Sequence, residues 1–182
     1  TLEGLGALRN EDLLVALKDE AAGVREHAMR LAEPRSLAEA ILPLAKDDQA
    51  RVRFQTAFTL GELKDARAID ALATIAKRDA ADLWIRTAVL CSVADTSDQL
   101  LALLLADAEF ATSSASTELI RELAQIIGVR GKPPEMQRAL AAVGGSDLES
   151  PALREVLSGI GEGLKRSSKS LRRAGFTGDA AA

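Results

Sequence analysis

The sequence is poor in cysteine, histidine and aromatic residues, and it has no long hydrophobic run. The 182 residues include one cysteine, Cys91, and one histidine, His27, which excludes an internal disulfide and a structural zinc site built from these residue types. Aromatic residues make up only 3%, with no tyrosine, so aliphatic side chains must fill the core, which favours packed helices over a β-sandwich. The longest apolar run, residues 100–106, is much shorter than a membrane span, and we expect no membrane insertion.

Charge is distributed unevenly along the chain. The net charge of −4 combines residues 1–164, which carry 18 basic and 26 acidic side chains, with residues 165–182, which carry five basic side chains and one acid. Because nucleic acid is bound mainly through cations, the acidic body predicts that nucleic acid is not the main partner. Residues 165–182 are predicted to form a flexible basic tail or linker. The chain begins with Thr1 and has no signal-peptide pattern, so we interpret it as a piece of a longer protein.

Three stretches of the chain share one pattern. Residues 16–25, 44–53 and 75–86 each pass from an apolar helix end, through a lysine and an acidic turn, to Val-Arg or Ile-Arg. The first members of these pairs, Val24, Val52 and Ile85, are separated by 28 and 33 residues, which is the length of a helix–turn–helix unit. Mostly apolar residues follow at the fourth, fifth and eighth positions after each, which is the spacing of one helix face.

This pattern predicts an all-α fold, specifically a right-handed α-solenoid of stacked antiparallel helix pairs of the armadillo type. Each pair alone leaves an apolar stripe uncovered, and stacking covers it. First helices are expected at residues 11–17, 37–45, 68–76 and 99–105, and second helices open at Val24, Val52 and Ile85. Pro43 should kink or restart the helix that contains it. Further helices are expected at residues 117–128, opened by a capping box at Thr117, and at 134–143 and 151–164, while residues 5–8 resemble the tail of another second helix.

An aspartate precedes an arginine at the same place in each unit. The pairs are Asp19 with Arg25, Asp47 with Arg53, and Asp79 with Arg86. An aspartate just before a helix can cap its free backbone N–H groups. The arginine falls on the buried face of the second helix, where a charge needs a partner, and the aspartate of its own unit or of the next unit is available. We therefore predict a structural ladder of these acid–arginine pairs.

The repeated acid and Val-Arg positions resemble HEAT repeats, clearly over residues 1–110 and with degenerate spacing over residues 111–164. Residues 51–63, 78–90 and 157–164 further resemble the HEAT segment of planctomycete-type membrane-bound dehydrogenases, which join a propeller, HEAT repeats and a cytochrome c. The resemblance implies a non-catalytic scaffold or docking segment, residues 1–164, of a larger bacterial and extracytoplasmic dehydrogenase-like protein, with protein as its partner. The chain has no Cys-x-x-Cys-His haem motif, so redox chemistry of such a parent would lie elsewhere.

No residue pattern indicates a catalytic, metal or cofactor site. His27 and Cys91 fall on different helix faces in different units, so a Cys–His dyad is not expected. The glycines at positions 4–6 and 159–163 do not follow a β-strand, which makes dinucleotide binding a poor interpretation. We attribute helix glycines of this kind to the close approach of neighbouring helices.

Four side chains are candidates for protein binding. Phe54 and Phe58 lie at about 200° and 240° around their helix, opposite a core face centred near about 70°. Rings on that side can anchor a partner, or flanking helices can bury them sideways. Trp84 has the same two interpretations, since it either meets a partner or fills the turn between units, and Arg30 completes the candidate set.

Two other functions suit a HEAT-like array. One is an enzyme domain resembling bilin lyases, which should bind a linear tetrapyrrole, or alkylpurine DNA glycosylases, which should present a cationic face that the acidic body lacks. The other is a free-standing scaffold that binds a peptide.

Overall fold

The computed structural model describes residues 3–35, 37–144 and 150–167, and most of them are helical. These ranges contain eleven α-helices, two short 3-10 helices and no β-strand, which confirms the predicted all-α class. No helix within them combines the length and the hydrophobicity needed to cross a membrane. The chain divides into two compact units, residues 1–93 and 94–182, which we call unit 1 and unit 2 and describe separately.

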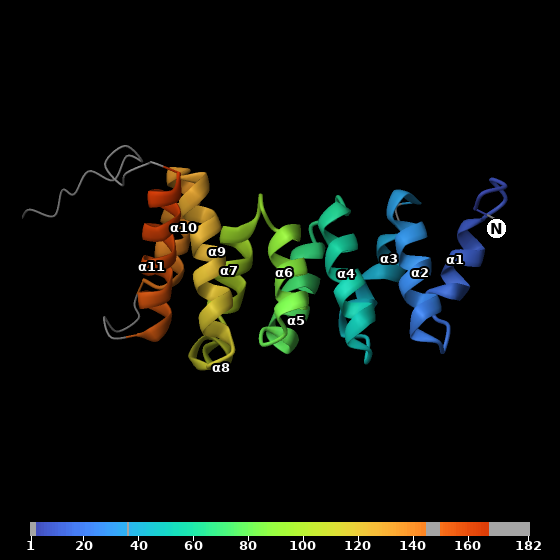
Figure 1. Ribbon diagram of the computed structural model, residues 1–182, viewed down its shortest axis with the longest axis horizontal. Coiled ribbons are helices and arrows are strands. Elements are labelled where there is room, and N and C mark those ends of the chain that lie inside the picture. Colours follow the sequence, from blue (N-terminus) through green and yellow to red (C-terminus); the bar gives the residue numbers. More distant parts are fainter. Residues whose placement is uncertain (1–2, 36, 145–149, 168–182) are drawn as a thin grey trace, which may run out of the picture. The chain divides into compact units, whose positions relative to one another are not determined.

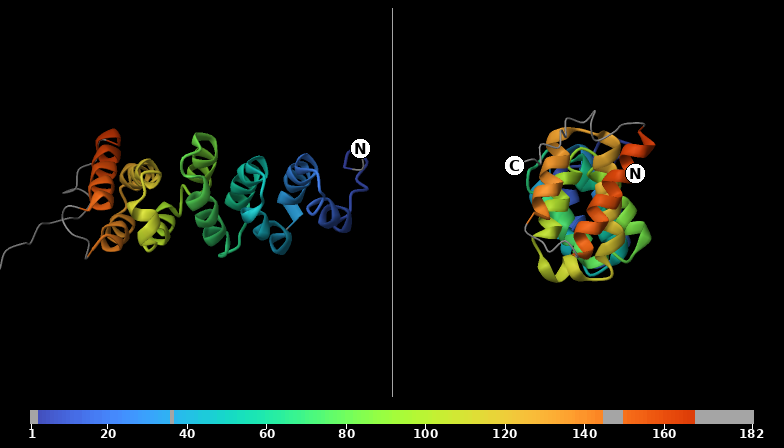
Figure 2. Two further views of the ribbon diagram at one scale, coloured as in Figure 1. Left: turned by 90° about the horizontal axis from the view of Figure 1, so that it is seen from below. Right: turned by 90° about the vertical axis from the view of Figure 1, so that its left-hand side faces the viewer.

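Unit 1 is built from two rows of helices. The first helices are α1, the α3–η2 pair and α5, and the second helices are α2, α4 and α6. Their bounds are α1 Asn10–Ala16, α2 Ala22–Ala32, η1 Glu33–Arg35, α3 Ala38–Ile41, η2 Leu42–Lys46, α4 Ala50–Glu62, α5 Ala68–Asp79 and α6 Leu83–Ser92. The second helices pack in series, α2 on α4 and α4 on α6, while α1 packs on α2, and η2 and α5 pack on α4 (Figures 1 and 2).

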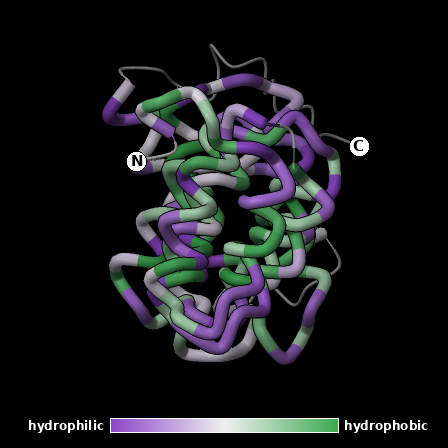
Figure 3. The backbone as a smooth tube through the Cα atoms, turned by 90° about the vertical axis from the view of Figure 1, so that its right-hand side faces the viewer, coloured by the Kyte–Doolittle hydropathy of each residue, from purple (hydrophilic) through white to green (hydrophobic). Residues whose placement is uncertain are grey.

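The core of unit 1 follows the predicted helix face. Met29 of α2, Ala57 and Leu60 of α4, and Val89 of α6 are buried, whereas Leu90 is only half-buried. Hydrophobic and hydrophilic stretches alternate along the backbone (Figure 3). Full burial of one leucine-sized side chain contributes about 2 kcal/mol, so packing of this shared face supplies the main stabilising term.

Pro43 divides one first helix in the way the sequence predicts. The α-helix α3 ends at Ile41, and the 3-10 helix η2 continues from Leu42 with Pro43 in its first turn. Proline has no backbone N–H to donate and its ring crowds the preceding turn, so a regular α-helix cannot run through it. This first helix is therefore short and irregular, while α5 in the next pair runs without a break from Ala68 to Asp79.

Unit 2 contains five α-helices in its described part. They are α7 Ser97–Leu105, α8 Ala108–Thr112, α9 Ser116–Arg130, α10 Pro133–Ala142 and α11 Pro151–Arg166. Gly131 ends α9 in the left-handed conformation, with φ 62°, and donates its N–H to the Ile127 carbonyl oxygen at 3.0 Å. Arg130 then forks onto the carboxylate of Glu135, at 2.8 and 3.0 Å, and so links the end of α9 to the first turn of α10.

Helices α9 and α11 approach each other through glycines. A Cβ atom added at Gly163 would lie 2.6 Å from the backbone nitrogen of Val129, and one at Gly159 would lie 2.7 Å from the Cβ of Ala124. A Cβ added at Gly161, between them, would meet nothing within 4 Å. The glycines at 159 and 163 therefore serve the close helix approach that the sequence suggests.

Four local predictions are wrong. Residues 5–8 are not a helix tail, because Gly6 takes a left-handed φ of 66° and closes a turn onto the Glu3 carbonyl oxygen. The short helix α8 was not expected. Thr117 does not open a capping box, since α9 begins at Ser116 after Ala115, which makes no side-chain cap. The predicted tail begins too early, because Lys165 and Arg166 form the last turn of α11, where cations suit the helix dipole; the rest of it, from residue 168, lies outside the described residues.

Candidate docking face and acid–arginine ladder

Arg53 of α4 is a charged side chain inside unit 1. Its Nε and Nη2 donate hydrogen bonds to the two carboxylate oxygens of Asp79, at 2.6 and 2.5 Å, and its Nη1 donates to the Asp47 carbonyl oxygen at 2.7 Å. The Arg53 and Asp79 side chains are only 5% and 10% exposed. A two-bond fork between opposite charges is stronger and more directional than a single neutral hydrogen bond. It ties α4 to the last residue of α5.

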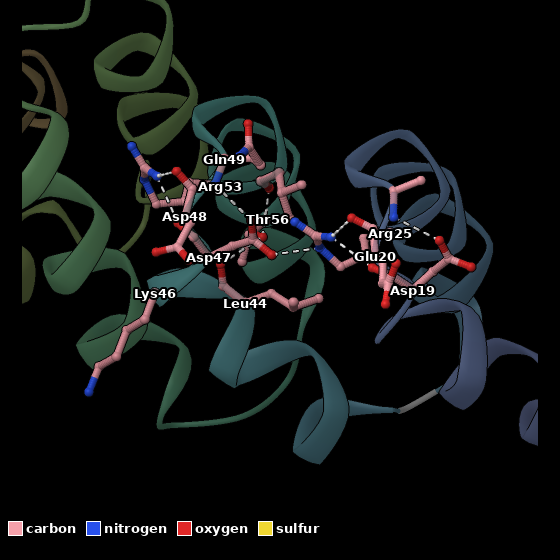
Figure 4. Close-up of polar contacts among 12 residues, drawn as sticks. Asp19, Glu20, Arg25, Leu44, Lys46, Asp47, Asp48, Gln49, Arg53 and Thr56 are labelled. Carbon is pink, nitrogen blue, oxygen red and sulfur yellow. Dashed lines mark hydrogen bonds and ion pairs between the residues drawn. The ribbon is translucent and has the colours of Figure 1, made fainter.

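Arg25 of α2 repeats this geometry one helix pair earlier (Figure 4). Its Nε and Nη2 donate to the Asp47 carboxylate at 2.7 and 2.8 Å, and its Nη1 donates to the carbonyl oxygens of Asp19 and Glu20 at 2.7 and 2.9 Å. Arg25 and Arg53 thus each bond the backbone of their own helix pair and the carboxylate of the next pair. The sequence analysis allowed the aspartate of either pair as the partner. In the structure, Nη1 bonds the backbone of the same pair, and Nε and Nη2 bond the carboxylate of the next pair.

Arg86 of α6 occupies the equivalent place in the third pair. Its Nη1 donates to the Ala80 carbonyl oxygen at 3.0 Å. Ala80 lies six residues before Arg86, as Asp19 lies before Arg25 and Asp47 before Arg53. The backbone half of the ladder therefore has the same register in all three pairs.

The aspartates of the first two pairs do not cap the second helices, which corrects the sequence prediction. Oδ1 of Asp19 and of Asp47 accepts the N–H two residues later, from Ala21 and Gln49, at 2.8 Å in both cases. Ala21 and Gln49 themselves hold the cap positions of α2 and α4, without a side-chain bond. The aspartates lie two residues before the cap positions, and an Asx turn is the bond within their reach.

In the third pair, capping and pairing fall to different residues. Asp82 caps α6, because its Oδ1 accepts the N–H groups of Trp84 and Ile85 at 2.9 and 3.0 Å, while Asp79 pairs with Arg53. Residues 75–86 are two residues longer than the corresponding segments 16–25 and 44–53, which makes room for both carboxylates. The capping bond also fixes Trp84 in the first turn of α6.

The ladder carboxylate of Asp47 is held in its charged form. Burial is the largest single influence and would raise its pKa, but the hydrogen bonds from Arg25 and Gln49 and the charges of Arg25 and Arg53 together lower the pKa below its ordinary value. The hydrogen bond to Asp79 is the main cause of the raised pKa of Arg53. Both residues therefore stay ionised near neutral pH, and the arrangement suits a structural role.

The predicted aromatic candidates lie on the outward side of the second helices. Phe54 and Phe58 contact each other edge to face, with ring centroids 5.1 Å apart and planes at 84°. Phe58 is 37% exposed and Trp84 is 72% exposed, whereas Phe54 is half-buried. Phe54 and Trp84 line one cavity of about 300 Å³ together with Ala50, Arg51, Asp82 and Ile85. The structure thus brings Phe54 and Trp84 to one site and places Phe58 beside it.

The fourth candidate, Arg30, belongs to a polar network next to the aromatic residues. Its Nη2 donates to Glu26 at 2.8 Å, and its Nε donates to Oε1 of Gln55 at 2.8 Å. Glu26 also accepts from Nε of Arg51, at 2.7 Å, at the rim of the cavity. Arg30 is therefore a partly neutralised cation that links α2 to α4, and it does not line the cavity.

A glycine contact sets the spacing of α4 and α6 beyond the cavity. A Cβ atom added at Gly61 would lie 2.7 Å from the Cβ of Ser92, so the two helices touch closely near their C-terminal ends. The cavity lies between their N-terminal turns, at Ala50 and Trp84.

Among residues 3–35, 37–144 and 150–167, no cluster of three or more His, Cys, Asp or Glu side chains could hold a metal ion. His27 and Cys91 are exposed and belong to α2 and α6, which pack on either side of α4. The structure does not bring them into one site.

Sequence reasoning missed Arg51 and Asp82, the two charged residues of the cavity. Asp82 had a readable signal, since an aspartate three residues before Ile85 is a typical N-cap position. Arg51 had none, because one arginine on a solvent-facing position is indistinguishable from any other surface cation. No protein-family model matches the chain, and no curated protein or solved structure is similar to it.

Proposed function

We propose that the chain is a non-catalytic scaffold of HEAT-repeat type, an α-solenoid that binds protein through the outward side of α2, α4 and α6. The observation that carries this proposal is the apolar cavity of about 300 Å³ between Phe54 and Trp84. A monomer has no packing reason to expose a tryptophan beside an open apolar cavity, and such features mark binding surfaces. The constant ladder register of α2, α4 and α6 supports the repeat assignment.

The ligand that suits this cavity is one large apolar side chain of a polypeptide. The volume is at the lower end of the range for ligand sites, and the lining is aromatic and aliphatic. Arg51 and Asp82 at the rim supply a donor and an acceptor for the backbone of such a segment. The charges of Arg51 and Asp82 are opposite and cancel, so the site has no net positive charge with which to bind nucleic acid.

The sequence resemblance supports a wider proposal. We place the segment in a larger bacterial, extracytoplasmic dehydrogenase-like protein, where it mediates contacts between domains or with a partner chain. Enzyme activity is not part of this proposal, because the candidate site offers no nucleophile paired with a base.

The single tryptophan of the chain gives a direct test. Because there is no tyrosine and Trp84 is the only indole, its emission reports on the cavity alone. Peptides selected from a display library on the full chain should shift the Trp84 emission to the blue on titration, since binding removes water from the ring. Ala50→Leu, which fills the cavity from its own wall, should weaken binding at least tenfold.

The matched control is Leu157→Ser on α11. Leu157 is also an exposed apolar residue, at 53%, but it belongs to unit 2. It should leave both the affinity and the emission shift unchanged. Selected peptides that bind Ala50→Leu as well as the natural chain would contradict the proposed site.

A further inference from the structure

The second helices α4 and α6 bury one further side, toward the helix that precedes them. In α4 this side consists of Val52, Gln55, Thr56 and Thr59, all of which are buried. Gln55 accepts a hydrogen bond from Arg30 of α2 at 2.8 Å, which shows that the side faces the preceding helix. Of the corresponding residues of α6, Ile85, Ala88 and Val89 are buried too, and Ser92 is half-buried.

The same side of α2 is only partly covered. Its corresponding residues are Val24, His27, Ala28 and Leu31, and all four line an apolar cavity of about 250 Å³ shared with α1. Val24 is 40% exposed and His27 is also exposed, whereas Leu31 is half-buried and Ala28 is buried. We call this cavity and its exposed rim the open end of unit 1; Leu8, Ala16 and the buried Leu13 also line the cavity.

Other exposed aliphatic side chains lie in the same N-terminal segment. Leu14 and Val15 of α1 are exposed, Val15 at 74%, and so is Leu5 in the preceding turn, although none of the three lines the cavity. An apolar cavity with an exposed aliphatic rim is of the kind that marks an interaction surface. Within the described part of unit 1, α1 packs chiefly on α2, and Arg35 of η1 also donates hydrogen bonds to the Leu8 carbonyl oxygen and to Oδ1 of Asn10, at 2.9 and 3.1 Å.

Asp19 supplies the electrostatic counterpart. It is the equivalent of Asp47 and Asp79, which accept the forks of Arg25 and Arg53 from the preceding pair. Oδ1 of Asp19 is already oriented by the Ala21 N–H at 2.8 Å, as Oδ1 of Asp47 is by Gln49. Asp19 is nevertheless exposed, and no arginine of the described ranges forms a salt bridge to its carboxylate.

We propose that the open end binds a further helix pair of the same repeat type, whose second helix carries an arginine in its first turn that forks onto Asp19. The apolar side of that helix would cover Val24 and Leu31, as α2 covers α4. Charge complementarity calls for a cation opposite Asp19, and hydrogen-bond geometry selects arginine over lysine, because the fork on Asp47 and Asp79 uses two parallel N–H donors. This surface is distinct from the aromatic cavity, so the two proposals can fail separately.

The test extends the full chain by one pair taken from itself. A copy of residues 37–62, which holds α3, η2 and α4, is placed directly ahead of Thr1, so that residues 1–9 become the connection to α1. The copied arginine then corresponds to Arg53 and should reach Asp19. A connection of nine residues costs little more entropy than a short one.

The readout is the dependence of Tm on Asp19. Asp19→Asn keeps the acceptor for Ala21 but removes the charge, and it should lower the Tm of the extended chain by about 5 °C or more. The same substitution should leave the natural chain within about 1 °C, because its Asp19 is solvated. Glu20→Gln, at the exposed neighbouring position, is the matched control and should leave both chains unchanged.

Two results would overturn the proposal. One is an equal effect of Asp19→Asn in both chains, which would mean that no fork forms. The other is a natural chain that sediments as a dimer and becomes a monomer on Val24→Asp, since a second copy would then occupy the open end.

Discussion

Arg53 and Asp47 show how single residues hold this helical chain together. Arg53 joins the Asp79 carboxylate to the backbone of Asp47, and the carboxylate of Asp47 receives Arg25. Arg25 and Arg53 therefore each donate four hydrogen bonds from their three guanidinium nitrogens. Buried charges without such partners cost several kcal/mol, so the ladder makes these charges tolerable and fixes the helix register.

Loss of the Asp47 charge should destabilise the chain in a pH-dependent way. Asp47→Asn leaves the Arg25 guanidinium without its counter-charge, and we expect the free energy of unfolding near pH 7 to fall by about 3 kcal/mol. The folded pKa of Asp47 is lowered from the ordinary 3.8, so its contribution is present above pH 3.8 and is lost as the pH falls through the lowered pKa. Denaturant unfolding between pH 7 and pH 3 should show the wild type and the variant converging in acid.

Asp48→Asn is the control for that series. Asp48 is exposed, and it takes part in the ladder through its carbonyl oxygen, which accepts from Arg53 at 3.1 Å. The substitution leaves that oxygen in place, so stability should match the wild type at every pH. A constant difference between the Asp47→Asn variant and the wild type down to pH 3 would show that packing, not charge, sets the effect.

At the scale of elements, glycine decides how closely helices approach. Gly163 and Gly159 let α11 lie against the backbone of α9, and Gly61 does the same for α4 against Ser92 of α6. A glycine costs a helix about 1 kcal/mol relative to alanine, so its presence there needs a packing reason. Gly161 has no such contact within 4 Å.

Two alanine substitutions on α11 should therefore have opposite signs. Gly163→Ala places a Cβ against the backbone of Val129 and should reduce the free energy of unfolding by about 1–3 kcal/mol. Gly161→Ala meets open space and should increase it by about 0.5–1 kcal/mol through helix propensity. Guanidinium denaturation of both variants is the measurement, and stabilisation by Gly163→Ala would contradict the close packing of α9 and α11.

The order of helices was largely predictable, and the exceptions have identifiable causes. The Val24, Val52 and Ile85 register located the second helices because mostly apolar residues follow each of them at helical spacing. Helix α8 was missed because five residues are too few to show a period. The turn at residues 3–6 was missed because residues 5–8 resemble residues 60–63 in sequence. That similarity does not reveal that Gly6 takes a left-handed backbone conformation.

At the scale of the whole molecule, the main electrostatic feature is the excess of acidic side chains in residues 1–164. Residues 1–164 carry 26 acidic and 18 basic side chains, and the positive charge is concentrated in residues 165–182. We therefore expect most of the chain to disfavour anionic polymers, and protein remains the partner that we propose.

Duplex DNA should bind only weakly. Fluorescence anisotropy of a labelled duplex should give a dissociation constant weaker than about 10⁻⁴ M at physiological salt. Any binding at low salt should disappear when residues 168–182 are deleted, because that removes most of the local cations. Submicromolar binding that survives the deletion would favour the glycosylase-like alternative.

The sequence by itself determined the all-α class, the three acid–arginine positions and the aromatic residues on the far side of α4, because these follow from helical periodicity and from the cost of burying charge. Tertiary structure decided which atoms the arginines bond, since Asp47 faces Arg25 only after α2 packs on α4. It also placed Trp84 across a cavity from Phe54 and left the Val24 side of α2 open, because distance between helices is set by glycines and neighbours rather than by any one helix.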